Sequence, residues 1–170
     1  MVLQPLATTT EKIATGGAGT RSHEFRKTHM IKIKLLSDAA KVPTYGTAGA
    51  ACFDLYASDS VAIPAGRAGT VKTDVSFAVP QGHVMLVFSR SGHGFKSGVR
   101  LSNCTGVIDS DYRGEVVARL KNDGRDDFHV LLGDRIAQAM ILPVEQVVFE
   151  VVDELDATER GTNGFGSTGA

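Results

Sequence analysis

The chain has 170 residues, 42 % of them hydrophobic, which predicts one soluble globular domain. Its 18 Lys and Arg against 19 Asp and Glu give a net charge of −1, which argues against holding nucleic acid by counterion release. Two distant cysteines, Cys52 and Cys104, exclude a disulfide framework or zinc motif and suggest a reducing compartment, and no apolar run reaches the roughly 18 residues of a membrane span.

The first 29 residues mix Thr, Gly, Ala and scattered charge without any hydrophobic period. We expect residues 1–29 to be a disordered extension, tag or leader. No apolar stretch of secretory-signal length occurs in them, and organelle targeting is the weaker alternative. The expected location is the cytoplasm, or the host cytoplasm if the source is viral.

From Met30 onward the chain consists of short segments rich in Val, Ile, Phe and Thr, each closed by Gly, Pro, Asn or Asp. Such regular spacing predicts an all-β fold, a jelly-roll-like antiparallel sandwich or barrel, over residues 30–155. The predicted strands are Ile31–Leu36, Ala51–Tyr56, Val71–Val79, Val84–Ser89, Glu115–Leu120, Phe128–Leu132 and Gln146–Val152.

The segment Arg135–Leu142 has residues that favour a helix, but it is short and Pro143 ends it, so a strand is predicted there too. At most one short helix is expected, after Ser91. The last residues, 156–170, are rich in Gly, Thr and Ser and are expected to form a mobile arm without a core of its own.

Glycines and charged residues cluster in five places. The first holds Asp54 in a predicted strand, where a carboxylate needs a partner; it either serves a site or simply caps a turn or pairs with an arginine. The second, residues 88–98, surrounds Arg90 with Ser and Gly, whose backbone N–H groups can converge on an anion, although a solvated turn is the plainer interpretation. His93 in this loop is interpreted as a bystander rather than a base.

The third cluster, residues 103–116, carries Asp109 and Asp111, of which one could face a pocket while the other caps a turn; an ordinary hairpin turn is equally compatible. In the fourth, Arg135 and Gln138 have odd spacing, so at most one of them should face a given site. The fifth, residues 160–169, has one Arg and one Phe among glycines and could close over a flat ring, or be a frayed end.

In this order the five clusters resemble the five motifs of the trimeric deoxyuridine triphosphatase (dUTPase) family. The resemblance extends from Met30 to Ala170 and is carried by RSG, GVIDSDYRGEV, GDRIAQ and RGTNGFGSTG. It implies a jelly-roll subunit, a homotrimer with sites shared between subunits, and Mg²⁺-dependent hydrolysis of dUTP to dUMP and pyrophosphate. It also implies a role in limiting uracil in DNA and in supplying dUMP for thymidylate synthesis.

The resemblance implies catalytic roles for three residues. Asp109 matches the carboxylate that orients and deprotonates the water attacking the α-phosphorus, Asp54 the first-motif carboxylate that supports the water and metal network, and Gln138 a group near the α-phosphate. Mg²⁺ would be held mainly by the triphosphate and waters, so no firm protein ligand is assigned.

Substrate-binding roles follow from the same resemblance. Base and sugar would meet Asn103, Gly106, Val107, Ile108 and Tyr112, whose ring would exclude a 2′-hydroxyl, while Phe165 would cover the uracil. The phosphates would meet Arg90, Ser91, Gly92, Arg160, Gly166 and Ser167.

The chain departs from the family at Cys52 and Ser102, where glycine is usual. Cys52 could crowd the first motif, although we expect it to be tolerated. Two alternatives remain open: the related dCTP deaminase, and a trimeric dUTP-binding regulatory module with slow hydrolysis. The intact Asp109, Tyr112 and Arg160 favour the diphosphatase.

Overall fold

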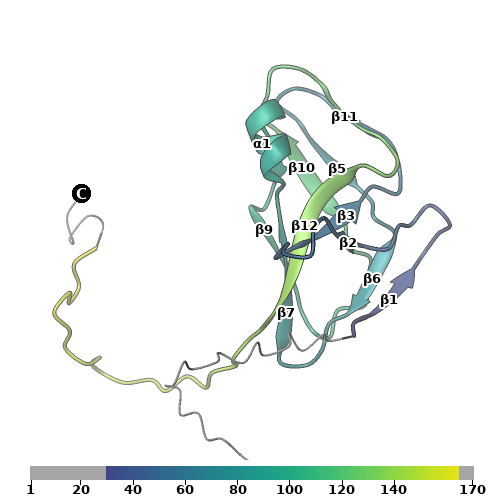
Figure 1. Ribbon diagram of the computed structural model, residues 1–170. Helices are drawn as coiled ribbons and strands as arrows, with labels where there is room; N and C mark the ends of the chain where they lie inside the picture. The colour runs from purple at the N-terminus through teal and green to yellow at the C-terminus, as the bar shows by residue number, and fades with distance from the viewer. Residues whose placement is uncertain (1–29, 165–170) are drawn as a thin grey trace, which may run out of the picture. The chain divides into compact units, whose positions relative to one another are not determined.

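A computed structural model describes residues 30–164 of the chain (Figure 1). They form short β-strands and one seven-residue helix. The elements are β1 (Lys32–Leu35), β2 (Thr44–Tyr45), β3 (Phe53–Tyr56), β4 (Val61–Ile63), β5 (Ala68–Val71), β6 (Val75–Ala78), β7 (His83–Phe88), α1 (Ser91–Ser97), β8 (Val99–Leu101), β9 (Thr105–Ile108), β10 (Ala118–Asn122), β11 (Phe128–Val130) and β12 (Arg135–Pro143).

All strand pairs are antiparallel, and the largest sheet has five strands in the order β2-β3-β12-β7-β9. A three-stranded sheet, β5-β10-β8, and two strand pairs, β1-β6 and β11-β4, complete the fold. The prediction of an all-β, jelly-roll-like antiparallel class is confirmed, and α1 is the single helix that the described residues contain.

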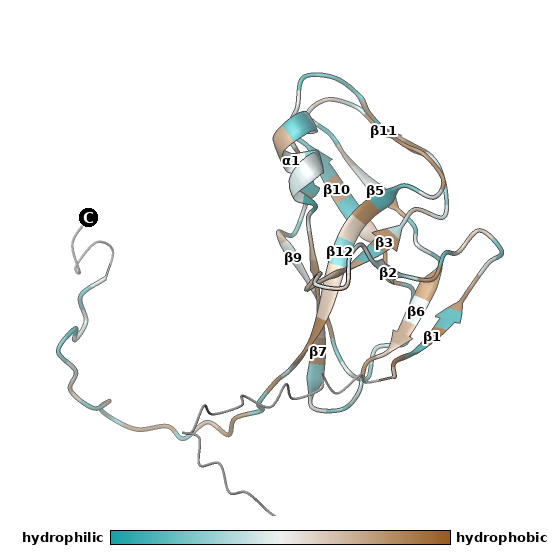
Figure 2. Ribbon diagram, viewed as in Figure 1, coloured by the Kyte–Doolittle hydropathy of each residue, from teal (hydrophilic) through white to brown (hydrophobic). Residues whose placement is uncertain are grey.

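Side chains from several of these sheets form one core. Its most fully buried large members are Leu55, Ile63, Met85, Leu120 and Ile136, each at most 1 % exposed. Buried and more exposed residues alternate along β10, as expected of a strand with one face on a core. Figure 2 shows the hydrophobic residues running along β6 and much of β12.

The predicted strand Arg135–Leu142 is confirmed as β12, which is paired with β3 on one side and β7 on the other. Two flanking ladders outweigh the modest helix preference of its residues. The short helix expected after Ser91 is confirmed as α1, and it ends where Gly98 takes a left-handed conformation, with φ 65°.

The segment Val71–Val79 is not one strand, as predicted, but two. β5 ends at Val71 and β6 begins at Val75, because Asp74 adopts a positive φ of 51° between them. The Glu115 carboxylate accepts the backbone N–H groups of Thr73 and Asp74 at 3.1 and 3.0 Å, in place of ladder partners. A side chain 41 residues away in the sequence therefore ends the strand.

The prediction of a strand over Gln146–Val152 is wrong for the single chain. No residue from 144 to 164 belongs to a strand or helix, and all of them are exposed. Val148 and Val151 are each 98 % exposed and Phe149 is 88 % exposed. An apolar run needs a neighbouring strand to become one itself, and the described part of the chain supplies none here.

Candidate functional site

Asp54 on β3 is a buried carboxylate held between two arginines. Its Oδ1 lies 3.1 Å from Arg90 Nε and its Oδ2 3.3 Å from Arg135 Nη1. The Asp54 side chain is 12 % exposed, against 23 % for Arg90 and 51 % for Arg135. Both carboxylate oxygens are thus engaged, and two guanidinium groups from different strand ends are brought together.

The fourth predicted cluster differs from expectation because β12 contains a bulge. Arg135 pairs with Tyr56, but the register shifts before Ala137, and Gln138 pairs with Asp54. Tyr56 and Asp54 lie two residues apart on β3, so they share a face, and the extra residue puts Arg135 and Gln138 on that same face. The prediction that at most one of them faces a given site was therefore wrong.

Arg135 is the site residue that sequence reasoning missed. Strict alternation along a strand assigned it to the opposite face from Gln138, and a bulge leaves no reliable mark in a single sequence. The sequence feature that could have indicated the position of Arg135 is the Gly-Asp pair directly before β12, in which Gly133 has a positive φ of 84°. Such a turn restricts how the following strand enters the sheet.

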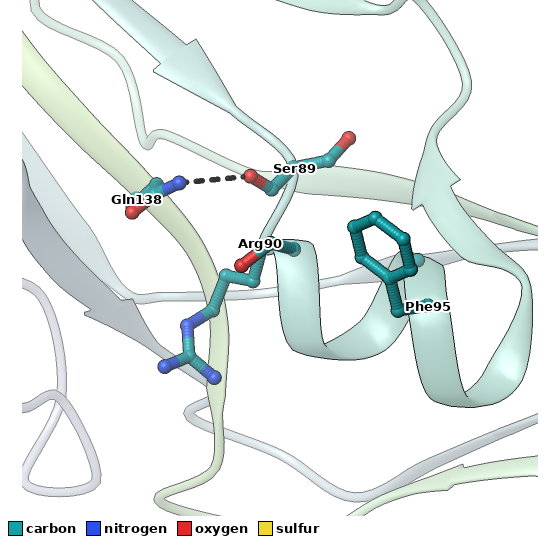
Figure 3. Close-up of a pocket in the computed structure, with 6 residues that line it drawn as sticks. Ser89, Arg90, Phe95 and Gln138 are labelled. Carbon is teal, nitrogen blue, oxygen red and sulfur yellow. Dashed lines mark hydrogen bonds between the residues drawn. The ribbon is translucent and has the colours of Figure 1, made fainter.

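The end of β7 and the start of α1 form one wall of a pocket. Gln138 Nε2 donates a hydrogen bond of 3.0 Å to the Ser89 carbonyl, which ties β12 to this wall (Figure 3). Figure 3 also shows Arg90 and the Phe95 ring on different sides of α1. The pocket has a volume of about 450 Å³ and is lined by Ser89, Arg90, Ser91, Gly94, Phe95 and Gln138.

Ser91 and Gly92 open α1 and are exposed. No hydrogen bond to the backbone N–H of either residue comes from residues 30–164. These two donors and the Arg90 guanidinium lie next to each other in the chain, so this end of the pocket offers several donors to an anion.

The turn between β8 and β9 and the strand after it carry the predicted base-binding residues, and the two strands belong to different sheets. Leu101 N donates to Ser89 Oγ at 2.8 Å, which connects β8 to the pocket wall. In the turn, Thr105 N donates to the Asn103 carbonyl at 2.6 Å, and Cys104 has a positive φ of 62°. After the turn, Gly106, Val107 and Ile108 lie in β9, the edge strand of the five-stranded sheet.

Asp109 follows β9 in an exposed turn. Tyr112 N donates to the Asp109 carbonyl at 3.2 Å, so the turn-like interpretation of this segment is correct for the backbone. The Asp109 carboxylate makes no hydrogen bond or ion pair with residues 30–164. Tyr112 is 45 % exposed, its OH donates to the Glu115 carbonyl at 3.1 Å, and its ring covers Gly114 so closely that a Cβ there would clash.

Strand register separates Asp109 from the arginine pair within one chain. On β9, Thr105 lies opposite Phe88, whereas Ile108 lies opposite Met85. Asp109 therefore follows the end of β9 that is remote from Arg90, about 10 Å or more along the strand. The structure brings Asp54, Arg90 and Gln138 together with the first residues of α1, but it does not bring Asp109 to them.

The predicted arm is described only as far as Gly164. Arg160 is exposed, lies in a turn closed by a bond from Asn163 N to its carbonyl at 3.2 Å, and contacts none of the site residues above. The remaining predicted contacts of the arm, Phe165, Gly166 and Ser167, lie outside the described residues, as do residues 1–29.

Both cysteines are free thiols. Cys52 is half-buried, and burial, followed by the negative charge of Asp54, raises the pKa of its thiol. The Cys52 thiol is therefore expected to be protonated near neutral pH.

Within residues 30–164, no group of three or more His, Cys, Asp or Glu side chains is arranged to hold a metal ion. No helix in this part of the chain is long and apolar enough to cross a membrane.

The fold and site define a class: an all-β protein of antiparallel sheets with a pocket at the β7–α1 junction that is lined by Arg90 and Gln138. A sequence model of the family described as dUTPase matches residues 38–169. The chain therefore belongs to the dUTPase family, and it is an enzyme of the hydrolase class. The resemblance identified from the five motifs is confirmed.

Curated relatives match along most of their length. The deoxyuridine 5′-triphosphate nucleotidohydrolase of Helicobacter hepaticus is 46 % identical over 142 residues, which cover 83 % of this chain and 90 % of the relative. The enzyme of the same name from Candida albicans is 46 % identical over 154 residues, covering 88 % and 94 %.

Solved structures give the same result. The dUTPase of Staphylococcus bacteriophage 80alpha with dUPNHPP superposes with a TM-score of 0.79 at 29 % identity, covering 84 % of this chain and all of that one. A G164S mutant of the phage enzyme with dUpNHpp gives a TM-score of 0.78 at 28 % identity, covering 84 % and 100 %.

Proposed function

We propose that the protein hydrolyses dUTP to dUMP and pyrophosphate by attack of water on the α-phosphorus. The new bond joins the water oxygen to this phosphorus, the bond to the α,β-bridging oxygen breaks, and pyrophosphate leaves with that oxygen. The observation that carries the proposal is the pocket in which Asp54 holds Arg90 beside Gln138 and the free donors of α1. Such a pocket suits a polyphosphate.

Asp109 is the proposed general base. It is exposed, and no partner among the described residues occupies its carboxylate, so it can accept a proton from a water molecule. Asp54 cannot easily do so, because both of its oxygens already face guanidinium groups. Its proposed role is to hold the arginines and the surrounding waters.

The β8–β9 turn, strand β9 and the turn after it are proposed to select the nucleoside. The free edge of β9 and the Asn103 amide can pair with the edge of uracil, and cytosine, which has an amino donor where uracil has a carbonyl acceptor, would leave a protein donor unpaired. Tyr112, packed over Gly114, offers a flat face to the deoxyribose, where a 2′-hydroxyl would collide.

The polyphosphate is proposed to lie along α1 and the arm. Arg90, the N–H groups of Ser91 and Gly92, and the Gln138 side chain would meet the α- and β-phosphates. Arg160 would hold the γ-phosphate together with Gly166 and Ser167, and Phe165 would cover the base. Each donor stabilises charge that grows on the phosphate oxygens during the reaction.

The residues fit a Mg²⁺ ion carried by the substrate. Each Asp54 oxygen already pairs with an arginine, and no cluster of three ligand side chains occurs among residues 30–164. Mg²⁺ keeps several waters and binds readily to phosphate oxygens, so these residues would contact it through water. It supplies charge neutralisation on the polyphosphate when bound.

A complete site is proposed to need three copies of the chain. Asp109 is remote from Arg90 within one chain, and the exposed apolar run around Phe149 has no strand partner among residues 30–164. Strand pairing of residues 146–152 with a second copy would cover that run, and a neighbour's Asp109 would complete the pocket. Sizing with light scattering should give three times the 18.0 kDa chain mass; a fully active monomer would overturn this.

The test of function is pyrophosphate release from dUTP with Mg²⁺, run beside dCTP, dTTP and UTP. Release from dUTP alone supports the proposal and its base and sugar selectivity. Ammonia from dCTP would instead identify a deaminase. Tight dUTP binding without either product would identify a regulatory module. In the cell we propose a cytoplasmic enzyme that limits uracil in DNA and supplies dUMP for thymidylate synthesis.

A further inference from the structure

The helix α1 forms part of one wall of the pocket, but its own residues do little to stabilise it. It has seven residues, none of them buried, and Arg90 at its N-cap makes no side-chain capping bond. Helices this short are not stable alone. Contacts with the rest of the domain must therefore fix the position of Ser91 and Gly92 relative to β12.

His93 supplies such contacts. Its Nε2 lies 2.7 Å from the Arg135 carbonyl oxygen, and its ring meets Phe128 edge to face at 5.2 Å between centroids. A carbonyl only accepts hydrogen bonds, so the Nε2 atom carries the proton and donates it. No other α1 side chain makes a hydrogen bond or ring contact with the described remainder of the chain.

The two partners of His93 are well placed to act as anchors. Phe128 packs against the hydrophobic core. The Arg135 carbonyl sits at the β12 bulge, and it also accepts a longer hydrogen bond of 3.4 Å from Arg90 Nη1. His93 thus connects α1 to the residue whose guanidinium pairs with Asp54.

We propose that His93 is a positioning residue for polyphosphate binding: it holds α1, with Ser91 and Gly92, at a set distance from Arg135 and Gln138 on β12. It acts through these residues and does not touch the reacting atoms. The proposal rests on the proposed function, since it concerns how that substrate is held.

The test uses His93→Ala, which removes both contacts, and His93→Gln, which keeps a side-chain N–H donor. The exposed neighbour His129 provides the control variant His129→Ala. Steady-state kinetics with dUTP should show KM raised about tenfold in His93→Ala, the scale of one lost hydrogen bond, with kcat less than about threefold lower. His93→Gln should recover most of the change in KM, and His129→Ala should leave it at the wild-type value.

Thermal unfolding of each variant separates positioning from folding. A wild-type KM in His93→Ala would overturn the proposal, and so would a raised KM that tracks a loss of melting temperature and is not recovered by His93→Gln. Failure of the proposed function appears elsewhere, as a wild-type enzyme that releases no pyrophosphate from dUTP. In that event, calorimetric titration with an α,β-imido analogue of dUTP gives the same comparison through Kd.

Discussion

Two carboxylates of this chain, Asp54 and Asp109, have opposite environments. Asp54 is 8 % exposed, lies inside a strand of the central sheet and pairs with Arg90 and Arg135. Asp109 lies in an exposed turn after an edge strand and has no partner among the described residues. The first carboxylate holds two arginines in place, while both oxygens of the second are without a partner among the described residues.

The difference indicates how two carboxylates of one chain can have different tasks in a site. A carboxylate that pairs with two guanidinium groups cannot move away without leaving both arginines unpaired. A carboxylate in an exposed turn can stay unpaired in one chain at little cost in free energy. This holds as long as the carboxylate becomes enclosed only when the full site assembles. Substitutions at the two positions should therefore differ in which property they damage.

The largest effect is expected from Asp109→Asn. Loss of the general base should lower kcat by about 10²- to 10⁴-fold, because the amide cannot take the proton of the attacking water. Binding of a non-hydrolysable dUTP analogue and the melting temperature should stay close to wild type. Single-turnover kinetics and calorimetry measure these quantities, and a variant with near wild-type kcat would exclude Asp109 as the base.

Removal of residues 160–170 tests whether Asp54 and Asp109 suffice for catalysis without the C-terminal arm. Arg160 makes no contact with either of them in the described chain, so the fold should be retained. We expect kcat/KM for dUTP to fall about a hundredfold, since one charged phosphate donor and the base cover are lost together. Circular dichroism checks the fold, and an unchanged kcat/KM would refute the role of the arm.

Asp54→Asn should damage stability as well as activity. It leaves Arg90 and Arg135 without their shared partner, and the free energy of unfolding should fall by about 1–3 kcal/mol, the lower end reflecting the partial exposure of Arg135. Urea denaturation measures this loss. Asp109→Asn, the matched carboxylate-to-amide control, should leave the unfolding midpoint unchanged. Equal losses of unfolding free energy in both variants would contradict the distinction between the two carboxylates.

The smallest expected effect is at Cys52, whose thiol reports the charge of Asp54. Burial first and Asp54 second raise the pKa of this thiol, so alkylation by iodoacetamide should be slow at pH 7 and accelerate as the pH rises toward that pKa. Asp54→Asn removes the second cause and should speed alkylation at a fixed pH, whereas Asp109→Asn should not. Peptide mass mapping follows Cys52 separately from Cys104.

Much of the fold could be predicted because the relevant signals are local. Val, Ile and Phe between turn residues mark most strands, and Pro143 with Gly98 marks the ends of β12 and α1. Very short strands such as β4 and β8 were missed, since three residues contain too little of a pattern. The break between β5 and β6 was missed because the Glu115 side chain that causes it is distant in sequence.

Of the predicted site residues, the structure brings Asp54, Arg90 and Gln138 together, and it adds Arg135, which strand alternation had placed on the opposite face from Gln138. The bulge in β12 that turns Arg135 toward Asp54 depends on how two strands pair, which no residue of either strand specifies alone. The anchoring role of His93 was missed for the same reason. Its partners, Phe128 and the Arg135 carbonyl, lie more than 30 residues away.

By itself, the sequence determined the all-β class, the family and the residue types available for chemistry, because strand patterns and five ordered motifs are written in consecutive residues. Only the tertiary structure decided which carboxylate is paired, which face Arg135 takes, and that residues 146–152 have no strand partner among the described residues. Each of these depends on the register between segments far apart in sequence, and pairing energy is gained only once those segments meet.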